Sequence, residues 1–363
     1  MWLIVTSIII CFLYLILLLV FIIGWKLIPD FEPTGNELVN TSLSVVIACK
    51  NEEEHIRRLL SSIAQQSYQN FELIIVNDHS TDRTKRIIEN VQTEFSKIQL
   101  IDAVGFGKKN ALKEGIQLAT GNLIVTTDAD CIPSFLWLES IVHFQNHNPC
   151  DLIICPVKFL GDSTLFSSLQ ILEFTSLVAS GAGASGAGMP IMCNGANLAF
   201  TRKAWLTSQA DLHSEELSGD DIFLLQSVKK KHGVIKFLKS DSAIVLTEPS
   251  VSLSAFCKQR CRWASKSPAY SDWQLIFTSC VVFSICVLPF VLIGFSFAEH
   301  KFLGILLSVL IFKYLLDTLF MLSVRSFFRL RHVAVHSLLL SLVYPFYIVL
   351  VSLSSLLFKP KNW

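Results

Sequence analysis

The sequence is short of charge. Of its 363 residues, 16% are Asp, Glu, Lys or Arg and 52% are hydrophobic, whereas a typical soluble domain has about 25% charged residues. The net charge of +1 at pH 7 gives no sign of the strongly basic surface that favours nucleic-acid binding. We therefore expect no nucleic-acid partner, and a chain whose apolar residues lie partly in a membrane.

Two further signals are missing. The ten cysteines include no Cys-x-x-Cys pair, which is the spacing typical of structural zinc sites. Because several of them lie inside apolar runs, they are predicted to be small buried side chains in a reducing compartment. The apolar run from Trp2 to Ile23 lacks the basic start and the small-residue cleavage site of a signal peptide. It is therefore expected to be a retained membrane anchor.

Long apolar runs are abundant, and each is long enough to cross a hydrocarbon core of about 30 Å. The predicted transmembrane helices are residues 1–24, 275–298, 302–324 and 333–358. Lys26 follows the first run, and three arginines precede the last one. The excess of basic residues on cytoplasmic loops predicts that the large segment between the first two spans is cytoplasmic.

Lys313 and Asp317 lie inside the third of these spans, one helical turn apart, and so are close enough to pair. Charged residues within a span are often functional. Compensation of charge within a helix bundle explains this pair equally well.

Residues 25–41 are predicted to be a linker, and residues 42–250 to be an α/β domain. In this segment, short apolar runs such as 43–48 and 71–76 alternate with helical patterns. Strands spaced by helices of this length predict βαβ units and a mainly parallel sheet. The glycine-rich run 180–188 lacks the Lys-Ser/Thr of a phosphate-binding loop, and we expect it to be a flexible connector.

One of the predicted strands, 123–127, ends at two carboxylates, Asp128 and Asp130. Alternate residues of an extended segment share a face, so both side chains are expected to point the same way. Ligands of open α/β sheets bind at the carboxyl ends of the strands. Hard oxygen ligands in that position suit Mg²⁺ or Mn²⁺ carrying a diphosphate.

Polar clusters also occupy residues 48–52, 77–82 and 219–221. Each of them alone fits an ordinary helix cap. Clusters at successive strand ends, however, are expected to line one crevice.

A last cluster lies in residues 251–270, which are predicted to form an amphipathic helix at the membrane surface. Gln259, Arg262 and Trp263 share one face of this helix by their spacing. Arg262 is suited to gripping phosphate oxygens, and Trp263 fits an interfacial anchor equally well.

In this order, the motifs resemble those of membrane-integrated family 2 glycosyltransferases. That group includes cellulose, chitin, hyaluronan and poly-N-acetylglucosamine synthases as well as ceramide glucosyltransferase. The matching positions are Ala48 to Glu52, Asp78, Asp128-x-Asp130, Gly219-Asp-Asp221 and Gln259-x-x-Arg262-Trp263. The resemblance implies a GT-A type domain inserted between transmembrane helices.

The resemblance also implies a role for each matching residue. The donor nucleotide sugar would be bound by Ala48, Glu52, Asp78, Lys108, Asp128, Gln259 and Arg262. The metal would be held by Asp130 with Asp128, and the acceptor would be contacted by Trp263. Asp221 matches the general base. Because Asp220 stands where Glu commonly precedes that base, either carboxylate could act, and His79 replaces a residue that is more often small.

These expectations describe an inverting, Mg²⁺- or Mn²⁺-dependent transferase, with a UDP-sugar as the expected donor. A lipid or lipid-linked acceptor is favoured, because four spans leave little protein to enclose a polymer channel. A processive polysaccharide synthase, completed by a partner subunit or a homo-oligomer, is the alternative, and an inactive membrane scaffold is a remote one. A bacterial inner membrane is the simplest setting.

Overall fold

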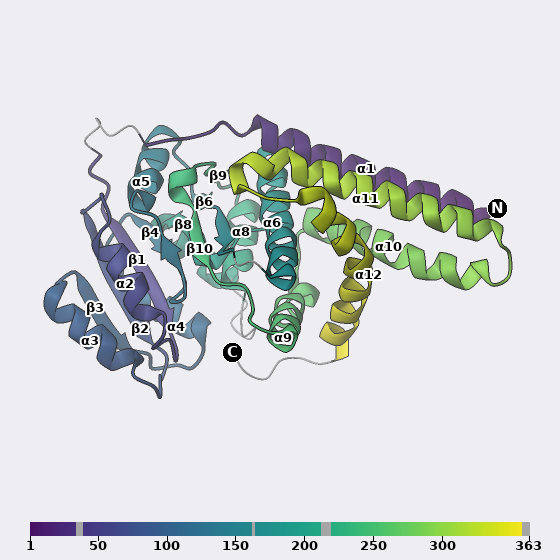
Figure 1. Cartoon of the computed structure of the whole chain (residues 1–363). Coiled ribbons are helices and arrows are strands. Elements are labelled where there is room, and N and C mark those ends of the chain that lie inside the picture. Colours follow the sequence, from purple (N-terminus) through teal and green to yellow (C-terminus); the bar gives the residue numbers. More distant parts are fainter. Residues whose placement is uncertain (34–38, 162–163, 212–218, 358–363) are drawn as a thin grey trace. The chain divides into compact units, whose positions relative to one another are not determined.

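The computed structural model describes residues 1–33, 39–161, 164–211 and 219–357. They form two compact units (Figure 1). The α/β unit comprises Ile28–Leu160 and Met192–Glu248. The helical unit comprises the described residues of Met1–Leu27, Gly161–Ile191 and 249–357. Residues 34–38 of the predicted linker and residue 358 of the predicted last span lie outside the described residues.

The α/β unit alternates strands and helices, as the sequence pattern predicts. Its first half holds β1 (Leu43–Cys49), α2 (Ile56–Ala64), β2 (Phe71–Asn77), α3 (Thr84–Glu94), β3 (Ile98–Asp102), α4 (Lys108–Leu118) and β4 (Leu123–Thr126). Its second half holds β5 (Ile132–Pro133), α5 (Trp137–His147), β6 (Leu152–Ile154), β7 (Val157–Phe159), β8 (Leu198–Thr201), α7 (Arg202–Ser208), α8 (Asp220–Lys230), β9 (Ile235–Phe237) and β10 (Val245–Thr247). Short 3₁₀ turns cover Gly195–Asn197, Gln209–Asp211 and Asp241–Ala243.

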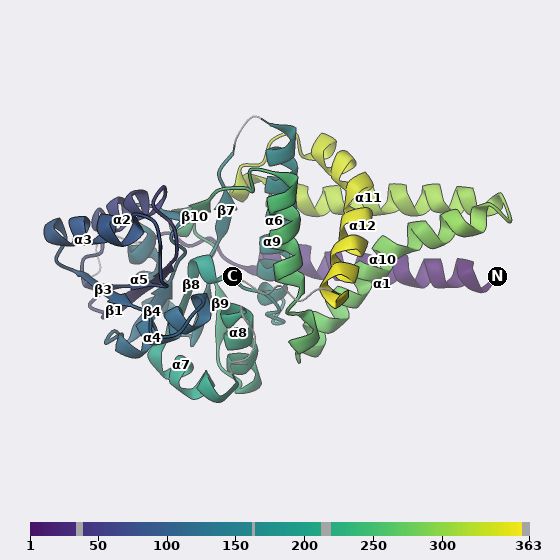
Figure 2. The same cartoon turned by 90° about the horizontal axis from the view of Figure 1, so that it is seen from below.

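The main sheet has seven strands in the order β3-β2-β1-β4-β8-β6-β9. The strands from β3 to β4 are parallel, whereas β8 runs antiparallel to both of its neighbours. Every residue of β1 is buried, as expected for a central strand covered on both faces. A smaller sheet joins β5, β10 and β7. In the second half, α7 and α8 pack beside each other, next to β8 and β9 respectively (Figure 2). The predicted α/β class with a mainly parallel sheet is confirmed.

The helical unit contains helices long and apolar enough to cross a membrane. Among the described residues there are five of them: α1 (Trp2–Leu27), α6 (Leu165–Gly186), α10 (Trp273–Ser296), α11 (Lys301–Phe328) and α12 (Val333–Leu357). The shorter α9 (Leu253–Ala264) and a 3₁₀ turn at Ser267–Ala269 precede α10. The sequence pattern predicted membrane spans at α1, α10, α11 and α12 but not at α6.

The prediction of a flexible connector at residues 180–188 is wrong, because α6 continues through most of that run. Its small residues allow two helices to approach closely. A Cβ added to Gly24 of α1 would lie 1.9 Å from the Gly183 carbonyl oxygen of α6, and one added to Gly183 would lie 2.3 Å from the Phe21 carbonyl oxygen. Small residues at helix interfaces serve this purpose in membranes, so glycine here is required by packing.

Lys313 and Asp317 of α11 form an ion pair. The Tyr14 hydroxyl of α1 donates a hydrogen bond to Asp317, and the Lys313 ammonium lies 5.2 Å from the ring centre of Tyr344 on α12. The pair therefore joins three helices through polar contacts, which satisfies groups that are costly to leave unpaired among apolar helices.

Candidate functional site

Parallel strands bring the predicted site residues of the α/β unit to one edge of the sheet. In the strand register, Cys49 of β1 lies opposite Asn77 of β2, and Val46 of β1 lies opposite Thr126 of β4. The segments that follow these strands therefore leave the sheet at the same edge. They carry Glu52 after β1, Asp78 after β2, and Asp128 and Asp130 after β4. Ala48 is buried within β1 itself.

Like charges crowd together at this edge. Burial raises the pKa of Asp130, and repulsion from the Asp128 carboxylate raises it further. Burial also raises the pKa of Glu52, with repulsion from Asp130 as the next cause. The Asp130 carboxylate accepts a hydrogen bond of 3.2 Å from the Thr247 hydroxyl. Lys108, which opens α4, forms an ion pair with Asp128. A cation bound here would relieve the remaining repulsion.

The donor set fits a divalent ion that is shared with a diphosphate. Within the described ranges, no group of three or more His, Cys, Asp or Glu side chains is arranged to hold a metal. The candidate ligands from the chain are the Asp128 and Asp130 carboxylates. Mg²⁺ and Mn²⁺ suit this arrangement, since Mg²⁺ in particular is usually held by one or two carboxylates together with substrate phosphates and water.

Asp221 is held close to the end of β4. One of its carboxylate oxygens accepts the Gly195 N–H at 3.0 Å, and the other accepts the Ile222 N–H at 2.8 Å. The Gly195 carbonyl in turn accepts a hydrogen bond of 3.0 Å from the hydroxyl of Thr126, the last residue of β4. Gly195 therefore links the predicted general base to the strand that carries the two metal-binding candidates.

Asp220, the neighbouring carboxylate at the start of α8, has a different surrounding. Its Oδ1 lies 3.7 Å from the Lys109 ammonium, which also lies 5.4 Å from the ring centre of Phe223. Two successive lysines of α4 thus reach both acidic motifs, Lys108 at Asp128 and Lys109 at Asp220. The Asp220 carboxylate is therefore paired with an ammonium, whereas the Asp221 carboxylate accepts backbone N–H groups.

Asp78 is fully buried and surrounded by donors. Both of its oxygens lie 3.1 Å from the Gly107 N–H at the start of α4, where the helix dipole stabilises a negative charge. The Lys50 ammonium is 3.5 Å from Oδ2, and Nδ1 of His79 is 3.2 Å from Oδ1. This explains how a carboxylate can be buried at the end of β2.

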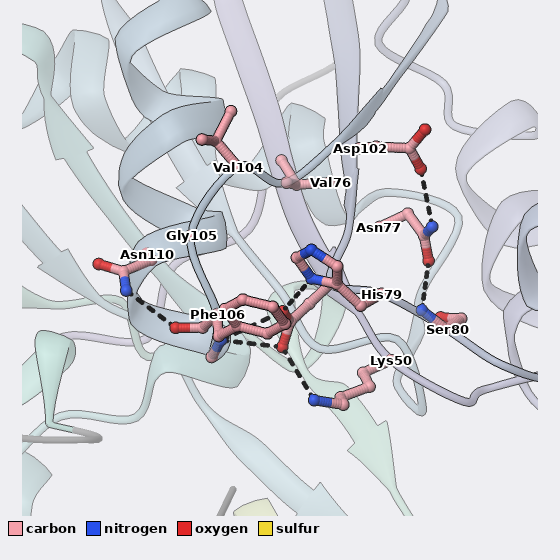
Figure 3. Close-up of polar contacts among 12 residues, drawn as sticks. Lys50, Val76, Asn77, His79, Ser80, Asp102, Val104, Gly105, Phe106 and Asn110 are labelled. Carbon is pink, nitrogen blue, oxygen red and sulfur yellow. Dashed lines mark hydrogen bonds and ion pairs between the residues drawn. The ribbon is translucent and has the colours of Figure 1, made fainter.

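The His79 ring stacks on Phe106, with ring centroids 4.1 Å apart and planes inclined by 16° (Figure 3). The backbone φ of His79 is 55°, a left-handed conformation that costs a residue with a Cβ about 1–2 kcal/mol. In the same view, Asn77 joins Asp102 to the Ser80 backbone. The turn is therefore held by polar contacts on one side of His79 and by an aromatic stack on the other.

Gln259, Arg262 and Trp263 lie on α9, in the helical unit. The structure places between them a residue that the sequence argument did not single out. Arg260 is 2% exposed and forms an ion pair with Glu173 of α6. It donates a hydrogen bond of 2.8 Å to the Gln259 side chain.

Arg260 also lies against the ring of Trp263, with 4.1 Å between the guanidinium carbon and the ring centre. Arg260 thus joins Gln259 and Trp263 into one cluster, whereas the half-buried Arg262 side chain makes no hydrogen bond or ion pair within the described part of the chain. Glu173 is a single charge within the apolar segment 165–179, but no local spacing pairs it with Arg260.

Comparison with known proteins bears on the whole arrangement. The family model described as "Glycosyl transferase family 2" matches residues 44–206. An uncharacterized glycosyltransferase of Haemophilus influenzae is 34% identical over 107 residues, which are 29% of this chain and 33% of that protein. The poly-beta-1,6-N-acetyl-D-glucosamine synthase of Staphylococcus epidermidis is 30% identical over 142 residues, 38% of this chain and 33% of that protein. The matches therefore span about a third of these relatives' length.

A solved structure is similar over nearly the whole chain. The mannosyltransferase PcManGT from Pyrobaculum calidifontis, solved in complex with GDP-Man and Mn²⁺, superposes with a TM-score of 0.62 at 16% identity. The superposition covers 98% of this chain and 96% of that one. The predicted GT-A type fold is confirmed, and the chain carries a glycosyl transferase family 2 domain over residues 44–206.

Proposed function

We propose that the protein is a membrane-bound, inverting, divalent-metal-dependent glycosyltransferase that moves a sugar from a nucleotide diphosphate to a lipid or lipid-linked acceptor. The observation that carries this proposal is the link from β4 through Gly195 to Asp221. It brings a candidate base to the sheet edge that holds Asp128 and Asp130. A sugar transferase of this kind needs a base for the acceptor and a cation for the leaving group.

Each residue has a part in this proposal. Asp128 and Asp130 would hold the metal, which when bound supplies positive charge to the diphosphate leaving group. The Asp221 carboxylate accepts the proton of the acceptor hydroxyl as that oxygen attacks the anomeric carbon. A base opposite the leaving group gives direct displacement and hence inversion. Ala48, Glu52, Asp78 and Lys108 line the nucleotide side, as the family resemblance implies.

The motif of α9 adds the remaining roles. Gln259 and Arg262 would bind the diphosphate, and Trp263 would contact the acceptor. An arginine suits this task because its guanidinium donates paired hydrogen bonds to phosphate oxygens. The Arg260 contacts to Gln259 and Trp263 support the proposal, since they fix the relative position of two of the three motif residues.

A UDP-sugar is the proposed donor, with GDP-mannose as the alternative. The relative named as a poly-beta-1,6-N-acetyl-D-glucosamine synthase supports an N-acetylglucosamine donor. The structural likeness to a mannosyltransferase bound to GDP-Man and Mn²⁺ makes GDP-mannose worth testing and supports Mn²⁺ as the ion.

The acceptor separates two versions of the function. The proposed lipid acceptor rests on the small number of candidate membrane spans among the described residues, which leave little protein to enclose a polymer channel. A processive synthase is supported by the name of the Staphylococcus epidermidis relative, and it would need a partner subunit or homo-oligomer to complete a channel. A bacterial inner membrane is the proposed setting, and Lys26 together with Arg325, Arg329 and Arg331 supports an α/β unit on the cytoplasmic side.

The test uses membranes containing the full-length protein, Mn²⁺ and labelled UDP-glucose, UDP-N-acetylglucosamine and GDP-mannose in turn. The products are partitioned between organic solvent and an insoluble high-mass fraction, with Asp221→Asn membranes as the control. Label in the organic phase that is absent from the control supports the proposal. Label in long polymer establishes the synthase, and no Asp221-dependent label from any donor contradicts transferase activity.

A further inference from the structure

We infer that the His79–Phe106 stack is the nucleobase platform of the donor site, on which the flat face of the base rests. This inference rests on the proposed function and deepens it. It assigns the recognition of the nucleobase to His79 and Phe106. The family motifs mark His79 only as larger than the usual residue at its position, and they do not include Phe106.

Phe106 is largely exposed to solvent. Its side chain is 71% exposed although one face of the ring lies on His79. The other face is therefore open to solvent. An exposed aromatic ring adds little to a core, whereas a flat open ring beside polar groups suits stacking with a planar heterocycle.

Hydrogen bonds hold the loop that carries the Phe106 ring in place without a ligand. The Phe106 carbonyl accepts a hydrogen bond of 2.8 Å from the Asn110 side chain. Glu114 of α4 accepts the N–H groups of Val104 and Gly105, both at 2.9 Å. The Gly107 N–H points at Asp78. A loop fixed at each of these points presents its aromatic ring at little entropic cost on binding.

Polar and charged groups lie beside the His79–Phe106 stack. His79 and Gly107 both contact the buried carboxylate of Asp78, and Lys50 approaches it as well. Figure 3 shows the rings of His79 and Phe106 and the Lys50 ammonium grouped around the end of β2. The buried Asp78 carboxylate holds the His79 ring in place, and the open face of Phe106 beside it matches the π-face of a nucleobase.

The backbone of His79 has a left-handed conformation. Glycine tolerates a φ of 55° far better than histidine does. A residue kept in such a conformation at a site edge points to a use for its side chain. The stack on Phe106 and the contact with Asp78 give the ring that use.

The experiment measures the affinity of the full-length protein in nanodiscs for UDP, GDP and inorganic pyrophosphate, each with Mn²⁺, by calorimetry. The variants are Phe106→Ala, Phe106→Tyr and His79→Gly, which suits the left-handed backbone. Val104→Ala is the matched control, since Val104 lies in the same loop and is 89% exposed. Pyrophosphate lacks a base and reports only on the phosphate and metal side.

We expect Phe106→Ala to weaken binding of the preferred nucleotide about tenfold, equivalent to about 1.4 kcal/mol. His79→Gly should weaken it several-fold, and Phe106→Tyr should retain it. Pyrophosphate binding should stay within twofold of wild type in every variant. Val104→Ala should resemble wild type with all three probes.

Unchanged nucleotide affinity in both Phe106→Ala and His79→Gly would overturn the inference and leave the proposed function standing. A parallel loss of pyrophosphate affinity would overturn it too, by showing that the stack only supports the loop. A Phe106→Ala variant that binds nucleotide normally but binds lipid vesicles more weakly would identify the ring as a membrane contact instead. If wild type binds neither UDP nor GDP, the proposed function fails and the inference fails with it.

Discussion

Charged side chains have different surroundings after β4 and in the helical unit. At the sheet edge of the α/β unit, carboxylates crowd against one another, and burial together with their mutual repulsion raises the pKa of Asp130 and of Glu52. In the helical unit, Arg260 is paired with Glu173, and Lys313 with Asp317. Opposite charges that satisfy each other hold helices together, whereas like charges held together await a cation. The proposed function assigns the first arrangement to metal binding and the second to the scaffold.

The largest effect is expected from the proposed base. Asp221→Asn keeps the shape of the side chain but removes the proton acceptor, so kcat should fall by about 10²–10⁴, the usual contribution of general acid–base catalysis. UDP affinity should change little. Steady-state transfer and calorimetric UDP binding measure the two quantities.

Asp220→Asn is the matched control, because the Asp220 carboxylate faces Lys109. Its kcat should fall far less than that of Asp221→Asn. If Asp220→Asn were the more damaging change, the assignment of the base would have to move to Asp220.

The next effect concerns the scaffold. Arg260→Met leaves Glu173 buried without its cation, which typically destabilises a protein by about 3–5 kcal/mol. The midpoint of thermal unfolding in detergent should therefore drop clearly. The double variant Arg260→Met/Glu173→Met should recover part of the loss, since it removes the stranded charge. A drop for the double variant at least as large as for the single one would argue that this pair is not the source of the stability.

The same measurement sharpens the comparison at the sheet edge. Asp130→Asn removes one of the repelling charges, so in excess chelator the unfolding midpoint should stay equal to that of wild type or rise. Functional sites often hold residues that cost stability. A large drop, comparable to that of Arg260→Met, would show that Asp130 is structural in the same sense as Arg260.

The smallest effect is expected from a carboxylate at the opposite end of β2. Glu72 accepts hydrogen bonds from Ser44, Thr120 and Gly121. Burial raises the pKa of Glu72, but these hydrogen bonds outweigh it and leave the pKa below the usual value of 4.5. The ionised form therefore contributes stability above pH 4.5, and this is lost as the pH falls through the lowered pKa.

For a partly exposed group this contribution should be below about 1 kcal/mol. Glu72→Gln should lower the unfolding midpoint slightly at pH 7, and the difference from wild type should shrink on acidification. Denaturation measured from pH 7 down to pH 3 checks the sign. A difference that grew towards low pH would contradict it.

The sequence predicts the α/β unit well because its signals are local. Strand and helix patterns, and the carboxylates directly after β4, are readable within a few residues of each other. Parallel topology brings separate strand ends together, so the pattern alone assigns Asp78 and Asp128 to one edge.

The helical unit is harder, because its key contacts join distant residues. Glu173 and Arg260 are 87 positions apart, and no spacing rule pairs them. The glycine-rich run 180–188 predicts a connector, because glycine weakens an isolated helix. The close approach of Gly24 and Gly183 reverses that meaning. In the α/β unit, the sequence does not predict the stack of His79 on Phe106 for a related reason. The stack depends on a turn conformation that residue types alone do not specify.

The most direct test of the contrast between the units is Mn²⁺ binding to the full-length protein in the presence of UDP, measured by electron paramagnetic resonance. Wild type should bind Mn²⁺, Asp130→Asn should bind it at least tenfold more weakly, and Asp317→Asn should bind it as wild type does. This result would place the ion at the crowded carboxylates after β4 and leave the paired charges of α11 as scaffold. Mn²⁺ binding that survives Asp130→Asn but is lost in Asp317→Asn would contradict the account.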